Sequence, residues 1–384
     1  MTITVHTAGA VFDGARLLAD HALVVEDGAV AALLPRGEVT DVALQDHGPG
    51  VLAPGFVDLQ VNGGGGVMFN DAPTLETLRR IASAHARLGS TAILPTLITD
   101  TPERTAQAIA AAVQAVAEGV AGIAGLHLEG PHLSRARHGA HDPALIRPMV
   151  EEDVQLLLAA AARLPVLKVT LAPESVAPAQ IARLAAAGVV VSLGHSDAGF
   201  AECMAAVAAG ARCVTHLFNA MSQLGSREPG LVGAALAAGE LSAGLIADAI
   251  HVHPATLALA LRAKAGPGKL YLVTDAMATA GSDIDSFTLD GREVRRHDGR
   301  LTLADGTLAG ADLEMARALQ VMIEQAGAAP ESALAMATAV PAQVIGAGDR
   351  LGHLAPGRTA DFVLLGKGWE LRGVWRAGMP VDRG

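Results

Sequence analysis

The sequence contains little cysteine, which excludes two common kinds of small-domain scaffold. Only Cys203 and Cys213 occur among the 384 residues, and they do not form a closely spaced metal-binding pair. We therefore expect neither a disulfide framework nor a zinc knuckle. Both thiols are predicted to be small buried hydrophobic side chains.

Basic residues and long apolar runs are also scarce. The chain has 28 Lys and Arg against 39 Asp and Glu, a formal net charge of -11. Nonspecific binding to nucleic acid or to an acidic membrane requires basic surface, so we expect neither partner. No apolar run reaches the ~18 residues of a membrane span. The residues Met1–Val5 lack the basic and apolar regions of a signal peptide, which predicts a cytoplasmic protein.

Apolar residues are abundant. They make up 51% of the chain, with 17% charged residues, so a large core can be buried. The chain is longer than a domain with one ordinary core. Its length fits a barrel, which can exceed about 250 residues, together with a small second domain.

The middle of the chain alternates apolar strands with alanine-rich helices. The predicted strands cover residues 56–62, 91–96, 123–129, 166–171, 189–195, 213–217, 243–248 and 270–275. The predicted helices cover residues 75–88, 102–118, 150–162, 177–186, 199–209, 231–238, 254–265 and 311–325. Eight such pairs predict an α/β fold, the (β/α)8 TIM barrel.

A doubly wound open sheet is the structural alternative. It more often has fewer strands and a glycine-rich phosphate turn after the first one. The segment Gly63-Gly64-Gly65-Gly66 lacks the G-x-G-x-x-G spacing and no helix opens directly from it, so we interpret it as a flexible active-site loop.

Both ends of the chain have a different pattern. Short β-type runs near residues 2–6, 22–25, 30–34, 361–365 and 371–375 lack intervening helices, which predicts one small β-sandwich built from both ends. We place its two parts at residues 1–53 and 341–384, and the barrel at residues 54–340. Three Asp-Gly pairs between residues 290 and 306 predict β-hairpins inserted near residues 286–308, over the barrel mouth.

Several predicted barrel strands end in a residue that can bind a metal or move a proton. Glu129, His195 and His216 end three of them. One carboxylate and two imidazoles form a standard catalytic zinc set that leaves a position for water, although iron, cobalt or manganese would also fit. Asp275 ends the eighth strand, and a carboxylate there could take a proton from water and return it to a leaving group.

Longer motifs carry a resemblance to a known family. The segments Pro54-Gly55-Phe56-Val57-Asp58 and Leu351-Gly352…Gly357…Ala360-Asp361 resemble the amidohydrolase superfamily. More specific blocks resemble the N-acetylglucosamine-6-phosphate deacetylase family: Leu126-His127-Leu128-Glu129-Gly130-Pro131, Thr215-His216-Leu217-Phe218-Asn219-Ala220-Met221 and Arg227-Glu228-Pro229-Gly230. The resemblance covers essentially the whole chain.

The resemblance implies roles for further residues. His141 would polarise the amide carbonyl, which is a task for a hydrogen-bond donor aimed at a developing oxyanion. Arg227 and His251 would bind the sugar phosphate, and a homodimer would follow if one of them reaches into a neighbouring subunit. The other implied substrate contacts are Ala140, Asn219, Ala220, Leu308, Ala309 and Gly310. Where the family usually has serine and threonine, this chain has Asp312 and Glu314.

The first barrel strand lacks the His-x-His pair with which many amidohydrolases hold a second metal. Gln60 and Asn62 occupy those positions, and amides are poor zinc ligands beside imidazole. We therefore expect one divalent metal per subunit, most simply zinc. Gln60 and Asn62 could instead orient water or the substrate amide.

The resemblance predicts hydrolysis of N-acetylglucosamine 6-phosphate to glucosamine 6-phosphate and acetate. One alternative is a related amidohydrolase that acts on an unphosphorylated N-acyl sugar or amino acid, which would not need Arg227 and His251. The other is a non-catalytic scaffold, which would have no use for Glu129, His195, His216 and Asp275 together.

Overall fold

The computed structural model describes residues 2–39 and 44–383. Eight parallel strands form its centre, and each pairs with the next along the chain. They are β8 (Phe56–Val61), β11 (Ser90–Ile98), β12 (Leu126–Glu129), β13 (Leu167–Leu171), β14 (Val190–Leu193), β15 (Cys213–Val214), β16 (Ser242–Leu245) and β17 (Leu270–Leu272). A parallel bridge between Val61 and Ala276 joins the first strand to the chain after the last, so the barrel is nearly closed. The predicted TIM barrel is confirmed.

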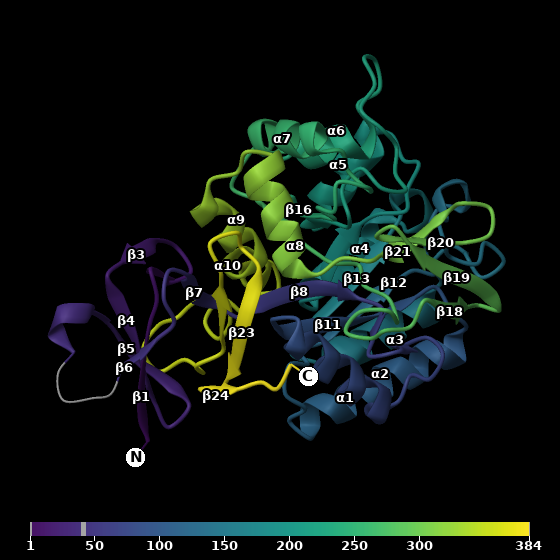
Figure 1. Cartoon of the computed structure of the whole chain (residues 1–384). Coiled ribbons are helices and arrows are strands. Elements are labelled where there is room, and N and C mark those ends of the chain that lie inside the picture. The colour runs from purple at the N-terminus through teal and green to yellow at the C-terminus, as the bar shows by residue number, and fades with distance from the viewer. Residues whose placement is uncertain (1, 40–43, 384) are drawn as a thin grey trace.

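Helices on the outside connect the strands (Figure 1). They are α1 (Leu75–Arg87), α2 (Pro102–Ala117), α3 (Glu151–Ala161), α4 (Pro178–Ala186), α5 (Phe200–Ala208), α6 (Gly230–Ala237), α7 (Pro254–Ala263) and α8 (Met315–Gln320), which continues as a π-helical turn over Val321–Gln325. Short 3-10 turns lie at Arg36–Glu38, Arg135–Arg137 and Pro173–Ser175. Helices α9 (Pro330–Ala337) and α10 (Ala339–Val344) follow.

Local signals in the sequence explain several helix boundaries. The Thr74 and Thr101 side chains accept hydrogen bonds from backbone N–H groups in the first turns of α1 and α2. Gly89 follows α1 with φ of +92°, which suits glycine after a helix. The prediction for the last barrel helix began too early, because Ala311 belongs to a strand and α8 begins at Met315.

Two sheets contain strands from the chain ends. One has the order β5 (Ala29–Pro35), β4 (His21–Glu26), β1 (Ile3–Thr7), β6 (Leu44–Asp46). The other has the order β24 (Met379–Pro380), β23 (Leu371–Arg376), β22 (Phe362–Leu365), β7 (Val51–Pro54), β2 (Ala10–Phe12), β3 (Leu17–Ala19). These first and last segments lie side by side in Figure 1 and share an apolar core that includes Leu23, Leu52 and Phe362. The predicted small β-domain from both ends is therefore confirmed, while its boundaries at residues 53 and 341 stay predictions.

A four-stranded antiparallel sheet, here called the insertion, follows the eighth barrel strand. It consists of β18 (Ser286–Leu289), β19 (Arg292–His297), β20 (Arg300–Thr302) and β21 (Leu308–Ala311). Asp290 and Gly291 both have positive φ, as the tight hairpin turn predicted there requires. A short hairpin of β9 (Gly63–Gly64) and β10 (Val67–Met68) contributes Met68 to the apolar cluster beneath the insertion.

Two arginines of the insertion bind the chain around the barrel mouth. The Arg292 side chain donates to the backbone carbonyl of Ala140, directly before His141. Arg296 forms an ion pair of 2.8 Å with Asp312. The carboxylate at position 312, a departure from the pattern of the resembled family, thus fastens the insertion to the chain that leads into α8.

Candidate active site

Four side chains meet at the carboxyl ends of the barrel strands. Glu129 is the last residue of β12, whereas His195, His216 and Asp275 follow β14, β15 and β17 by two or three residues. All four line one cavity of about 390 Å³. Parallel strands bring their carboxyl ends to one face of a barrel, which is why residues so distant in sequence meet here.

Three of these side chains form a compact triangle of possible metal ligands. The Nε2 atoms of His195 and His216 lie 3.0 Å apart. Glu129 Oε1 lies 3.4 Å from the first and 3.1 Å from the second. Tetrahedral ligands at about 2.0–2.1 Å from zinc are about 3.3 Å from one another, so these spacings fit one metal ion.

The groups behind the triangle support that use. His195 Nδ1 lies 2.8 Å from the carbonyl oxygen of Arg137, to which it can donate its hydrogen, leaving Nε2 with a free lone pair. The Gln60 amide donates to both oxygens of Glu129, at 3.1 Å each. Burial would raise the pKa of Glu129, but the neighbouring His195 and His216 imidazoles hold that pKa well below its usual value. The carboxylate is therefore kept in the ionised form that a metal needs.

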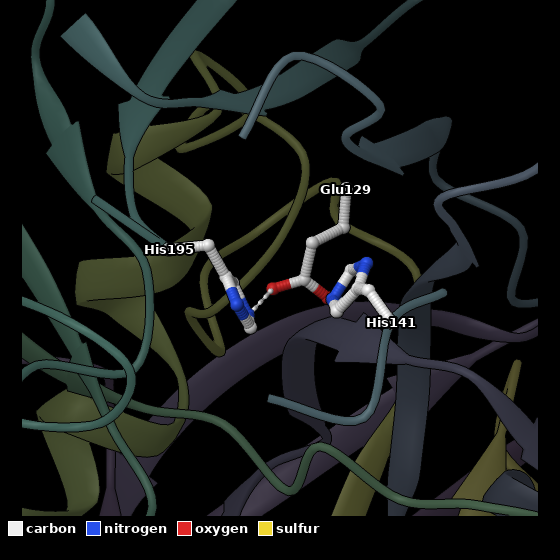
Figure 2. Close-up of side chains that lie close together, drawn as sticks. All are labelled: Glu129, His141 and His195. Atoms are coloured by element: carbon white, nitrogen blue, oxygen red, sulfur yellow. Dashed lines mark ion pairs between the residues drawn. The ribbon is translucent and has the colours of Figure 1, made fainter. Parts of the chain in front are cut away.

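His141 offers a second possible ligand set. Glu129, His141 and His195 each present a ligand atom, and these atoms lie within 4.8 Å of one another. Figure 2 shows the Glu129 carboxylate between the two imidazole rings. The set with His216 has spacings of 3.0–3.4 Å, which are those of ligands around one tetrahedral zinc ion, whereas the set with His141 meets only the wider limit of 4.8 Å.

Asp275 is held beside the triangle by the first barrel strand. The Asn62 amide donates to Asp275 Oδ1 at 2.7 Å. Burial and the neighbouring Glu129 charge raise the pKa of Asp275, partly offset by His216 and the Asn62 bond. A carboxylate with a raised pKa is a better proton acceptor than an ordinary aspartate. Gln60 and Asn62 thus each orient one carboxylate, and their contact with substrate stays a prediction.

The rest of the cavity includes most of the predicted substrate residues. Ala140, His141, Asn219, Ala220, His251, Leu308 and Gly310 line it. His251 Nδ1 lies 2.5 Å from Asp248 Oδ2, and this hydrogen bond holds the pKa of Asp248 below its usual value despite burial. Ala309 packs in the core beneath the insertion instead. Arg227 is exposed in the segment before α6 and is not among the described residues that line this cavity.

Other residues that line the cavity were not predicted from the sequence. Arg137, in a 3-10 turn, and Thr307, in a loop, have no local pattern that marks a site. Ile98, Ile246 and Met277 resemble ordinary core residues in sequence. Arg137 donates to Asp197 at 2.8 Å. In the sequence, only its place in a basic segment after β12 pointed to a role for Arg137 in the site.

The barrel, the strand-end triangle and the adjacent carboxylate define a class of hydrolase. The chain matches the amidohydrolase family over residues 51–381 and belongs to that family. This confirms the resemblance in the motifs.

Within this family, the chain is similar to several deacetylases of amino-sugar phosphates. The chain is 45% identical over 378 residues to an N-acetylgalactosamine-6-phosphate deacetylase of Shewanella sp. (strain ANA-3), covering 95% of this chain and 94% of that one. It is 33% identical to an N-acetylglucosamine-6-phosphate deacetylase of Haemophilus influenzae, covering 93% and 94%. The crystal structure of N-acetylglucosamine-6-phosphate deacetylase from Pasteurella multocida has a TM-score of 0.93 at 32% identity and covers 99% of both chains.

Cys203 and Cys213 are both free and buried, as expected. Among the described residues, no helix is both long and apolar enough to cross a membrane. The predicted cytoplasmic location stays a prediction.

Proposed function

We propose that the protein is a metal-dependent hydrolase that removes the acetyl group from an N-acetylhexosamine 6-phosphate. The observation that carries this proposal is the triangle of Glu129, His195 and His216 beside Asp275 in a cavity. A scaffold protein would not need that arrangement. The names of the relatives support the choice of substrate class.

The chain's own groups can perform the proton transfers of amide hydrolysis. A divalent metal held by Glu129, His195 and His216 would polarise the amide and lower the pKa of water. Asp275 takes the proton from the attacking water. The C–N bond then breaks, and Asp275 delivers the proton to the departing nitrogen, so that amine and acetate are the products. His141 donates a hydrogen bond to the carbonyl oxygen as negative charge develops there.

We propose a single metal ion, most simply zinc, with iron, cobalt or manganese as alternatives. Gln60 and Asn62 replace the histidines that would support a second ion, and their amides are engaged with Glu129 and Asp275. The three ligand atoms lie 3.0–3.4 Å from one another. This spacing favours a small first-row ion but does not discriminate among these metals.

The sugar has two candidate configurations. The motifs predict N-acetylglucosamine 6-phosphate. The relative at 45% identity is named for the galactosamine epimer, and this observation favours N-acetylgalactosamine 6-phosphate as the second candidate. The two compounds differ only in the orientation of the hydroxyl at C4, so the same hydrolytic machinery serves both.

The proposed phosphate site combines His251 with Arg227 of a second copy. His251 lines the cavity, whereas Arg227 lies on an exposed segment of its own chain. A guanidinium supplied by a neighbouring subunit would add the positive charge that the net charge of -11 does not supply. A homodimer is therefore part of the proposal.

Acetate release tests this function. Both N-acetylhexosamine 6-phosphates, their unphosphorylated counterparts and an N-acetyl amino acid should be compared on protein of measured metal content. We expect kcat/KM to be largest for one of the two phosphorylated sugars. Equal turnover of phosphorylated and unphosphorylated sugars would favour the alternative amidohydrolase, and no turnover of any compound by metal-loaded protein would favour a scaffold.

A further inference from the structure

Thr99 lies directly behind His141, at the end of β11. Its side chain is buried among the loops that follow β11 and β12, with a relative exposure of 1% for the residue. The Thr99 backbone N–H donates to His141 Nδ1 at 3.3 Å, and the Thr99 hydroxyl lies 2.8 Å from the same nitrogen. A Cβ atom added to Gly130 would come within 2.2 Å of that hydroxyl oxygen, so the fit around Thr99 is close.

These contacts decide which nitrogen of neutral His141 carries hydrogen. The backbone N–H of Thr99 has a fixed direction and cannot become an acceptor. A hydrogen on His141 Nδ1 would face it, whereas a lone pair on Nδ1 can accept from both the N–H and the hydroxyl. Among the described residues, the other acceptor near the hydroxyl is the carbonyl of Glu129, at a longer distance of 3.4 Å. Thr99 therefore favours the tautomer with hydrogen on Nε2.

His195 has the opposite arrangement. Its Nδ1 faces the carbonyl oxygen of Arg137 at 2.8 Å, which requires hydrogen on Nδ1 and leaves the lone pair on Nε2. The two rings are in edge contact, with centroids 4.3 Å apart. The two neighbouring imidazoles are similarly buried, but a backbone donor faces Nδ1 of His141 and a backbone acceptor faces Nδ1 of His195. His141 can therefore donate a hydrogen bond from Nε2, whereas His195 can bind a metal through Nε2.

We infer that Thr99 is a positioning residue that holds His141 as an Nε2–H donor and so keeps it out of the metal's ligand set. An Nε2 atom that carries hydrogen cannot donate its lone pair to a metal, but it can donate a hydrogen bond to an acyl oxygen. The ligands are then Glu129, His195 and His216, and not the alternative set with His141. The tautomer and the ligand set do not depend on the identity of the sugar; only the consequence for turnover rests on the proposed function.

The tautomer can be read directly by NMR on the full chain labelled with 15N in histidine. The His141 resonances would be assigned by their loss in His141→Gln. We expect a protonated Nε2 and an unprotonated Nδ1 for His141, and the reverse for His195 in the metal-free protein. A protonated Nδ1 on His141 would overturn the inference.

Metal content and rate provide the second readout. His141→Gln should retain one equivalent of zinc after dialysis, whereas His216→Ala should lose it; loss in both would overturn the inference. Thr99→Val replaces the hydroxyl with a methyl group of similar size and keeps the backbone N–H. We therefore expect a shift of the His141 Nδ1 resonance and a fall in kcat of about tenfold, with KM and zinc content unchanged. Thr99→Ser should restore both.

An unchanged resonance and rate in Thr99→Val would show that Thr99 has no positioning role. If the wild-type protein releases no acetate from any of the sugars, the proposed function fails, while the tautomer and the zinc content of the variants still decide this inference.

Discussion

At the scale of single residues, the backbone around the site adopts a conformation that these residue types seldom adopt. His195, His216 and Asp275 have φ of +46°, +26° and +53°, in the left-handed region. Such conformations cost of order 1–3 kcal/mol each and persist only where the surroundings enforce them. The turn after each strand points the side chain into the cavity. The strained backbone therefore lowers the stability of the fold but places three functional groups in the site.

The proton-transfer role of Asp275 can be tested by Asp275→Asn. Asn has nearly the same shape and can still pair with Asn62, but it cannot accept a proton. We expect the fold and the metal to remain, and turnover to fall by about 10²–10⁴-fold. Activity should be lost as pH falls and Asp275 becomes protonated, and this acidic limb of kcat/KM against pH should be missing or displaced in Asp275→Asn.

The control for this substitution is Asp285→Asn, at an exposed position in the segment before the insertion. It should leave the pH profile of acetate release unchanged. A metal-loaded Asp275→Asn protein that works within a few-fold of wild type would show that another group is the base.

At the scale of elements, the first and last barrel strands are joined by a buried carboxylate. Asp58 of β8 is fully buried and accepts hydrogen bonds from the backbone N–H and the hydroxyl of Thr274. Burial raises the pKa of Asp58 to about 7, although the Thr274 and Gln60 bonds oppose this. The folded protein therefore binds a proton at Asp58 over a pH range in which the unfolded chain does not.

This proton makes the stability dependent on pH. Between the unfolded pKa of 3.8 and the folded pKa of about 7, the contribution of Asp58 to stability is lost as pH rises. The free energy of unfolding of the wild-type protein should fall between about pH 5 and about pH 8. In Asp58→Asn, which has no titrating group at this position, that fall should be smaller by on the order of 1–4 kcal/mol. Urea unfolding of both proteins at the two pH values measures it. An identical pH dependence in the two proteins would contradict a raised pKa for Asp58.

Strand order and the strand-end groups were predictable from the sequence, because the barrel strands are apolar runs and several of these runs lead into a polar residue. Glu129 and His216 could be found in this way without any knowledge of the loops. The roles of Gln60, Thr99 and Arg137 could not, since they depend on contacts between different strands and loops. The insertion was predictable from its Asp-Gly turns, but its attachment through Arg296 and Asp312 was not.

At the scale of the whole molecule, the proposed phosphate site needs a second copy of the chain. Arg227→Ala should lower kcat/KM for the phosphorylated sugar by about ten- to a hundredfold, mainly through KM, and leave metal content unchanged, because a charge-assisted hydrogen bond contributes roughly 1.5–3 kcal/mol. The effect should be small for the unphosphorylated sugar, which is the internal control.

Subunit mixing distinguishes a contribution from the partner from one within the same chain. Arg227→Ala subunits retain an intact metal site, and His195→Ala subunits retain the arginine. Hybrids of the two should regain activity, whereas mixtures of either variant with the double variant should not. Failure of exchanged hybrids to regain activity would place Arg227 in its own subunit's site or outside the site.

We propose that one metal ion, held by Glu129, His195 and His216, makes this barrel a hydrolase. Titration of zinc into metal-free protein, followed by acetate release from the preferred N-acetylhexosamine 6-phosphate, tests it most directly. We expect activity to rise linearly to one equivalent per chain and then stay constant, and His195→Ala to gain no activity over the same range. Activity that develops only between one and two equivalents, or that is full without added metal in protein shown to contain none, would contradict it.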